Sequence, residues 1–294
     1  MSISANTRAV LALLAASFLF GATFVVIKTA LDDIGSLSLV AWRFLIGAIV
    51  LALLAVPRGR ALWYHGGIAG LALFAGYAFQ TAGLVETTAS NSALITGLYV
   101  VITPFLSAAF NRRSPSRWVV VAAAGSFVGL VLLTETEGLS LQGGDLLTLG
   151  CAVSFAFHIV ALARYAPHHP VVPFTAVQLG VTALLAFVAA FAVEGISVPA
   201  RSVWGALIMT GIGVSVLAFL LQVWAQTVIG ASTAAVILGA EPAFGVATAW
   251  VVLGETLDAK GWIGAALIFA AILVVVTLQR DQSFKQAEAV TPAH

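Results

Sequence analysis

Charged residues are scarce in this chain of 294 residues. Only 9% of the residues are Asp, Glu, Lys or Arg, whereas 61% are hydrophobic, and the mean hydropathy is +1.07. A water-soluble domain carries about 25% charged residues, because its surface must be hydrated. This composition excludes an ordinary soluble fold and indicates that lipid covers most of the surface. The net charge of +1 gives no reason to expect a nucleic-acid partner.

Cysteine and histidine are rare as well. The single cysteine, Cys151, excludes an intramolecular disulfide and a metal site built from several thiolates. The five histidines are scattered and include no His-Glu-x-x-His pattern of a zinc enzyme. The apolar runs also contain no nucleophile elbow and no pair of acidic residues. We therefore expect no metal, no cofactor and no enzymatic activity.

Long apolar runs dominate what is present. A bilayer core requires about 20 apolar residues per helix. The chain contains ten runs of about this length, which predict an all-α membrane protein with ten transmembrane helices. The first run is too long for the apolar part of a secretory signal. The residues from Arg280 onward are polar and are predicted to form a disordered tail. The ten runs cover residues 9–30, 36–56, 66–86, 90–110, 117–134, 145–164, 171–193, 203–226, 231–252 and 261–279.

The charges between the runs predict the orientation. If the N-terminus is cytoplasmic, nine of the thirteen Lys and Arg residues lie in cytoplasmic segments, while the opposite segments hold most of the acidic residues. Positive charge follows the cytoplasmic side of a membrane. We therefore expect a multi-pass protein of the cell inner membrane with both termini in the cytoplasm. The nine are Arg8, Arg58, Arg60, Arg112, Arg113, Arg117, Arg164, Arg280 and Lys285.

The chain also repeats itself. Residues 89–97 (ASNSALITG) resemble residues 231–239 (ASTAAVILG), which begin 142 residues later, with five identities in nine positions. The same offset pairs Gln80 with Gln222 and Tyr99 with Glu241, and a slightly smaller one pairs Arg43 with Gln178. Each half then holds five helices, and an odd number requires the second half to be inverted. We predict one repeat over residues 1–137, an inverted repeat over 138–279 and a cytoplasmic tail over 280–294. Such repeats are typical of secondary transporters that bind substrate near the midplane.

Several short motifs, in order, resemble a known family. Residues 20–28 (FGATFVVIK), the pair Arg43-Phe44, residues 144–145 (GD) and residues 253–255 (LGE) are similar to motifs of the drug/metabolite transporter superfamily, EamA branch. Within it, the sequence resembles the YddG-like exporters of aromatic amino acids. The resemblance implies ten helices in two EamA repeats and export of metabolites, amino acids among them. The first half carries residues 111–113 (NRR) where the second carries LGE, so the Gly-Glu pair is not repeated.

Polar side chains within the apolar runs are the candidates for a substrate site, because such groups are costly in lipid. Glu241 lies midway along its run and mirrors Tyr99. The site role is favoured for Glu241 over that of a buried structural partner for Arg43 or a backbone group, and His158 could relay protons, bind a carboxylate or be a packing residue. Arg43 could hold a carboxylate of the substrate or of the protein. The predicted substrate-binding residues are Tyr77, Gln80, Tyr99, His158, Gln222 and Glu241.

The favoured function is a secondary transporter that exports small metabolites by alternating access, with aromatic or a broad range of amino acids as substrates. Phosphorylated substrates would require several cations near the midplane, where Arg43 stands alone. The alternatives are an efflux carrier for drugs or cationic compounds, a channel and, less favoured, a membrane enzyme. Proton coupling and facilitation both stay open, and we expect a monomer or a weak homodimer. Further aromatic residues predicted to line the site are Phe18, Phe20, Phe24, Phe79, Phe155 and Phe157.

Overall fold

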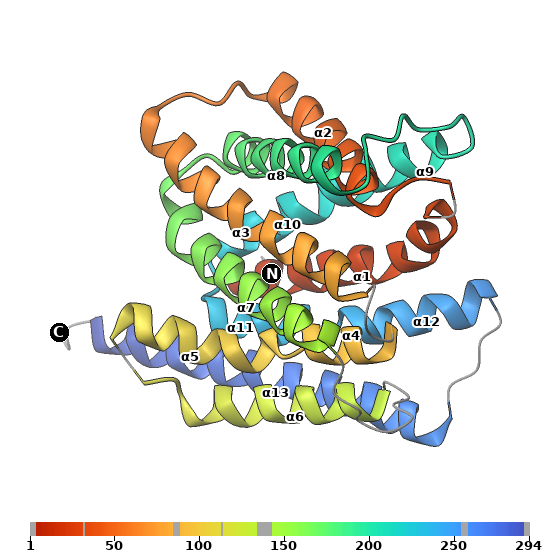
Figure 1. The fold of residues 1–294 in the computed structure, drawn as a ribbon. Coiled ribbons are helices and arrows are strands. Elements are labelled where there is room, and N and C mark those ends of the chain that lie inside the picture. The colour runs from red at the N-terminus through yellow and green to blue at the C-terminus, as the bar shows by residue number, and fades with distance from the viewer. Residues whose placement is uncertain are drawn as a thin grey trace.

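The apolar runs fold as helices, since a helix satisfies its backbone hydrogen bonds within one segment and can therefore enter lipid. Figure 1 shows a computed structural model, which describes residues 4–31, 33–84, 89–112, 114–133, 143–253 and 258–290. All regular elements within these ranges are helical. They are α1 (Ala5–Ala30), α2 (Ser36–Leu54), α3 (Arg60–Leu84), α4 (Ala89–Thr96), α5 (Tyr99–Asn111), α6 (Arg117–Leu133), α7 (Gly143–Tyr165), η1 (Ala166–His168), α8 (Val171–Val193), α9 (Trp204–Ile208), η2 (Met209–Val216), α10 (Leu217–Gln226), α11 (Ala231–Leu238), α12 (Glu241–Leu253) and α13 (Ala259–Val290).

Eight helical segments in the described part of the chain are long and apolar enough to cross a membrane. The two other predicted runs fall on α3, which is not among these eight, and on α6, which is apolar but only 17 residues long in the described part. Ten membrane crossings therefore stay a prediction. The eight segments are Ala5–Thr23, Ser36–Leu54, Ser92–Asn111, Gly144–His168, Val171–Val193, Trp204–Gln226, Ala231–Val252 and Ala259–Thr277.

The C-terminal end differs from the expected disordered tail. Helix α13 continues from the apolar run to Val290. The residues after Arg280 include Gln, Lys, Glu and Ala, which all have high helix propensity. The prediction of disorder was therefore wrong for residues 280–290, because polarity alone does not end a helix.

The helices pack in the same pattern in both halves of the chain. Helix α1 contacts α10 and α12, while α7 contacts α3 and α5. The pairs α2 with α8 and α6 with α13 each join one helix from each half. In Figure 1, α2 and α8 lie along one edge of the bundle and α6 and α13 along the opposite edge. The two halves thus contribute equivalent helices to equivalent contacts.

Two predicted runs are interrupted helices. Segments α4 and α5 are separated at Gly97 and Leu98, and α11 and α12 are separated at Gly239 and Ala240. In both pairs the first segment has 8 residues and the second has 13. The sequence was read as continuous over both runs, and that reading was wrong. Hydropathy does not detect such breaks, because glycine and its apolar neighbours keep the run apolar.

A third predicted run, residues 203–226, contains a wide turn. It begins as α9, continues as the π-helix η2 and ends as α10. Such helices are rare, and they occur often at functional sites. The π-helix contacts α2, α1 and α10. A disturbed backbone therefore lies beside the helices that carry several candidate residues.

Candidate functional site

The two helix breaks lie side by side. A Cβ placed on Gly239 would be 3.0 Å from Val100 Cγ2, and Val100 lies just after the other break. Helix α1 covers the α11 end of its break, where the Ser17 hydroxyl donates a hydrogen bond to the carbonyl oxygen of Ile237 at 3.1 Å. Carbonyl groups at a helix end lack partners within the helix. The break is therefore stabilised by a neighbouring helix.

Tyr99 and Glu241 occupy equivalent places at the breaks. Each is the first residue of the second segment, at the start of α5 and α12 respectively. Glu241 precedes Pro242, whose missing N–H is tolerated in the first turn of a helix. The offset of 142 residues that paired these two residues in the sequence therefore corresponds to equivalent positions at the two helix starts.

Polar groups from four other helices lie within electrostatic range of Glu241. Its carboxyl group is close enough to interact electrostatically with Tyr77 of α3, Tyr99 of α5 and Cys151 of α7. The Arg43 guanidinium of α2 also acts on it electrostatically. Tyr77 and Glu241 are partly buried, whereas Tyr99 is buried. Three of the predicted site residues, Tyr77, Tyr99 and Glu241, thus gather around one point of the bundle.

An aromatic cluster adjoins these polar groups through the Tyr77 ring. The Phe44 ring lies 5.2 Å from that of Tyr77 and 5.7 Å from that of Phe219, measured between centroids. Phe20 packs edge-on against Phe219 at 5.1 Å, and Phe155 packs edge-on against Tyr77 at 5.6 Å. Edge-to-face rings at such distances are favourable. We call Phe20, Phe44, Tyr77, Phe155 and Phe219 the central aromatic cluster.

His158 lies beside the central aromatic cluster and is paired. Its Nε2 is 3.1 Å from Oε1 of Gln178 on α8, and both side chains are buried. Its ring lies 6.2 Å from that of Phe219. The pairing gives His158 a structural partner, which was one of the two roles left open by the sequence. Gln178 is the residue that the repeat pairs with Arg43.

Gln80 and Gln222 lie near the ends of α3 and α10. Gln80 is partly buried and lies four residues before the end of α3 at Leu84. Gln222 is buried four residues before the end of α10, where its Nε2 donates to Oε1 of Gln226 at 3.3 Å. Gln226 Nε2 in turn donates to the Ile159 carbonyl oxygen at 2.8 Å. Gln222 therefore belongs to a hydrogen-bonded chain that links α10 to α7, and Gln80 lies one turn beyond Tyr77 on α3.

The aromatic residues divide as well. Phe20 and Phe155 belong to the central aromatic cluster, but Phe18 and Phe79 are 49% and 39% exposed. The Phe24 side chain lies outside the described part of the structure. The sequence analysis missed Phe44 and Phe219 as cluster members. The Arg43-Phe44 motif could have indicated Phe44, whereas no sequence pattern indicated Phe219.

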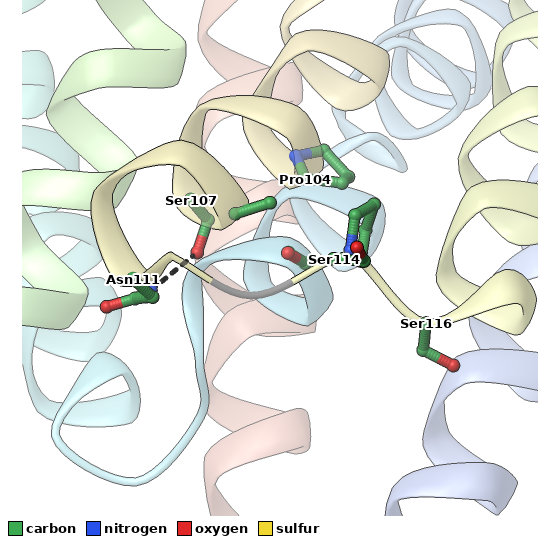
Figure 2. Close-up of a pocket in the computed structure, with 8 residues that line it drawn as sticks. Pro104, Ser107, Asn111, Ser114 and Ser116 are labelled. Carbon is green, nitrogen blue, oxygen red and sulfur yellow. Dashed lines mark hydrogen bonds between the residues drawn. The ribbon is translucent and has the colours of Figure 1, made fainter.

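A separate cavity of about 460 Å³ lies at the C-terminal end of α5, and Figure 2 shows its lining. Ser232 of α11 also lines it, and Asn111 Nδ2 donates to Ser107 Oγ across one turn at 3.2 Å. None of the six predicted site residues borders this cavity. Four of its eight lining residues are serines and none is charged, so its walls offer hydrogen bonds but no charge. The labelled lining residues are Pro104, Ser107, Asn111, Ser114 and Ser116.

Comparison with known proteins identifies the family. The sequence model of the EamA-like transporter family matches residues 7–135 and, a second time, residues 142–277. An uncharacterized transporter of Archaeoglobus fulgidus is 31% identical over 271 residues, which cover 88% of this chain and 82% of that protein. The uncharacterized transporter YyaM of Bacillus subtilis is 28% identical over 298 residues, covering 94% and 96% of the two chains.

A solved crystal structure shares the fold. It superposes with a TM-score of 0.80 at 23% sequence identity, over 92% of this chain and 98% of that chain. The two family matches lie one after the other and together cover most of the sequence, in agreement with the equivalent contacts of the two halves. The chain therefore belongs to the EamA-like transporter family, whose repeat it carries twice, and it is a multi-pass membrane protein.

Proposed function

We propose that this protein is a secondary transporter that exports amino acids, aromatic ones or a broad range, by alternating access. The observation that carries the proposal is the convergence of Tyr77, Tyr99 and Glu241 where two equivalent helices are interrupted. Interrupted helices at a repeat interface form the substrate sites of many secondary transporters. A carboxylate and two phenol groups at such a point suit a zwitterion better than an apolar solute.

The central aromatic cluster supports a substrate with a flat or apolar side chain. Phe44, Phe155 and Phe219 adjoin the polar groups, so one molecule can place a charged end and a side chain on different walls. Binding sites for small molecules commonly combine apolar walls with a few polar groups. We include His158, Gln80 and Gln222 in the proposed site as residues that the substrate meets on its way through the bundle.

The proposed architecture has ten membrane crossings in two inverted repeats, residues 1–137 and 138–279. The matching contacts of α1 and α7 support this arrangement. The charge distribution supports cytoplasmic termini in a cell inner membrane, with residues 280–294 on the cytoplasmic side. We further propose that the protein acts as a monomer or weak homodimer on a small molecule, and without nucleic acid.

Transport by site variants tests the proposal. Purified protein in sealed vesicles should show saturable flux of phenylalanine or another amino acid. Tyr99→Ala and Gln80→Ala should lower that flux while the protein still inserts and folds. Ser202→Ala, at an exposed hydrogen bond to Asp33, is the matched control and should leave the flux unchanged. Normal transport by both site variants would place the site elsewhere.

Glu241→Gln separates two coupling mechanisms. A proton-coupled exporter should lose its response to an imposed pH gradient, because the exchanged proton would have no carboxylate to bind. A facilitator should change only the concentration that gives half-maximal flux. Wild-type flux should be followed with and without the gradient, since a gradient-independent wild type already excludes the first mechanism.

A growth-rescue screen tests the substrate class. Cells poisoned by accumulated amino acids should grow better when the protein is expressed, and the set of relieved amino acids defines its range. Resistance to cationic drugs without any such rescue would favour the efflux-carrier alternative. Flux that does not saturate would indicate a channel, and the lack of any flux would favour an enzyme.

A further inference from the structure

Three buried polar atoms in the described part of the chain have no hydrogen-bond partner. They are Nε of Arg43, Nε2 of Gln178 and Oγ of Ser215. Arg43 is 5% exposed, and the other two residues are fully buried. An unpaired polar group inside a protein costs about 1–3 kcal/mol, and more when the group is charged. Such groups call for a physical explanation.

The three residues belong to helices that pack on one another. Arg43 lies on α2, Gln178 on α8 and Ser215 in the π-helix η2. A Cβ on Gly47, one turn beyond Arg43, would lie 3.1 Å from Leu179 Cδ1 and 3.3 Å from Ser215 Cβ. The unpaired donors are thus concentrated where α2, α8 and the disturbed backbone meet.

The Arg43 guanidinium lies over rings of the central aromatic cluster. Its carbon is 4.7 Å from the Phe44 ring centroid and 5.2 Å from that of Tyr77. Ring faces stabilise the positive charge, and the Tyr77 hydroxyl group is a side-chain hydrogen-bond partner of Arg43. The Nε–H group has no acceptor. The donors of the guanidinium plane match the two oxygens of a carboxylate. The side chain is therefore held in place while its Nε–H stays free for an acceptor.

The two halves of the chain differ at this position. The repeat places Gln178 where the first half has Arg43, and the amide oxygen of Gln178 is engaged by His158. One half therefore supplies a cation and the other a neutral donor. Glu241 lies within electrostatic range of both Arg43 and Tyr77. Such a pair of opposite charges is suited to the two ends of one zwitterion.

We propose that Arg43 is the carboxylate receptor of the transport site, and that Glu241 faces the ammonium end of the same substrate. This inference rests on the proposed amino acid transport and deepens it, because it makes the carboxylate a requirement. An amine with the same side chain but no carboxylate is then a poor substrate.

The test compares two molecules that share one ring, L-phenylalanine and phenethylamine, which lacks the carboxylate. Flux and competition are measured with the full-length protein in sealed vesicles. Wild type should transport phenylalanine without competition from an equal concentration of phenethylamine. Arg43→Gln should raise the half-saturating phenylalanine concentration at least about tenfold, as expected for loss of a charged hydrogen bond. Arg43→Lys should be intermediate, because it keeps the charge but loses the planar fork.

A control variant and a double variant test whether the role of Arg43 is purely structural. Arg201→Gln removes an exposed arginine and should transport like wild type. In the double variant Arg43→Gln with Glu241→Gln, a structural counter-ion role predicts recovery of phenylalanine affinity, whereas a carboxylate receptor predicts none. Thermal unfolding in detergent shows whether each variant is folded. If Arg43→Gln does not fold, the Arg43→Lys variant still decides. If Arg43 supplies only a structural charge, Arg43→Lys should bind phenylalanine with wild-type affinity.

Three results would overturn the inference. These are wild-type affinity in both Arg43 variants, recovery in the double variant, and competition by phenethylamine as strong as that by phenylalanine. A wild-type protein that moves no amino acid is a different outcome. It would remove the proposed function, and the inference would fail with it.

Discussion

Gly129 of α6 and Gly264 of α13 approach each other so closely that a side chain on either would collide with the backbone oxygen of the other. They are 135 residues apart, the separation that also relates Arg43 to Gln178. The contact is reciprocal, as expected for equivalent positions of two repeats. Small residues let membrane helices pack backbone to backbone. This contact therefore joins the halves along the edge of the bundle formed by α6 and α13.

Replacing Gly129 by alanine should destabilise the protein. The added Cβ would lie 2.6 Å from the Gly264 oxygen, so the helices must separate, at a cost of about 1–3 kcal/mol for overpacking. Gly125→Ala is the matched control, because it lies one turn away on α6 with open space around its Cβ. Thermal unfolding in detergent should show a clear loss for Gly129→Ala only. Equal behaviour of both variants would contradict the close contact.

Glu194 at the end of α8 holds the start of α2. Its Oε1 accepts hydrogen bonds from the Ser38 backbone N–H at 2.7 Å and from the Ser38 hydroxyl at 2.8 Å. A carboxylate at a helix N-terminus satisfies free N–H groups and the helix dipole. We expect Glu194→Ala to lower the free energy of unfolding by about 1 kcal/mol, as for loss of a helix cap. The measurement is chemical or thermal unfolding in detergent. Glu194→Gln keeps one acceptor and should lose less, and an alanine variant as stable as wild type would argue against the cap.

Two histidines beside the start of α8 predict a pH dependence. His65 Nδ1 and His169 Nε2 are 2.8 Å apart, and the His169 ring stacks on Phe174. Partial burial lowers the pKa of His169 below its usual 6.5, and positive charge on His65 and His168 lowers it further. The folded state thus binds this proton less readily than the unfolded state. The contribution of neutral His169 to the free energy of unfolding is therefore fully present above about pH 6.5 and is lost as the pH falls.

The measurement for this pair is the unfolding temperature at pH 7.5, 6.5 and 5.5. Wild type should lose stability on acidification, and His169→Gln should lose less because glutamine does not titrate. His168→Gln should change the profile less than His169→Gln, since His168 is exposed, lies outside the hydrogen bond and acts on His169 only through its charge. An identical pH profile for wild type and His169→Gln would refute the assignment.

Reporter fusions test the topology. A fusion after Arg60 should report the cytoplasm, and one after Glu137, which lies outside the described residues, should report the opposite side. The reason is the alternation of positive charge along the chain. The fused reporter is an enzyme that is active on only one side of the membrane, and its activity in cells is measured. Fusions that report the same side would contradict the ten-crossing arrangement and with it the inverted repeat.

Much of the helical framework could be predicted from the sequence. Apolar runs such as 36–56 and 171–193 fall on α2 and α8, because burial in lipid requires length and low polarity and both are visible in composition. The pairing of Tyr99 with Glu241 was visible too, as a shared offset. The helix breaks and the π-helix were not, because they depend on how Gly97, Gly239 and Gly211 pack against neighbouring helices.

The sequence by itself determined that this chain is a helical membrane protein with two related halves, since hydropathy, charge and self-similarity are linear properties. Only the tertiary structure decided which polar residues meet. It placed Tyr77 and Tyr99 within electrostatic range of Glu241, paired His158 with Gln178 and linked Gln222 to Gln226. It also added Phe44 and Phe219 to the central aromatic cluster. Such meetings join residues far apart in the chain, and they depend on how the helices cross and rotate rather than on any local pattern.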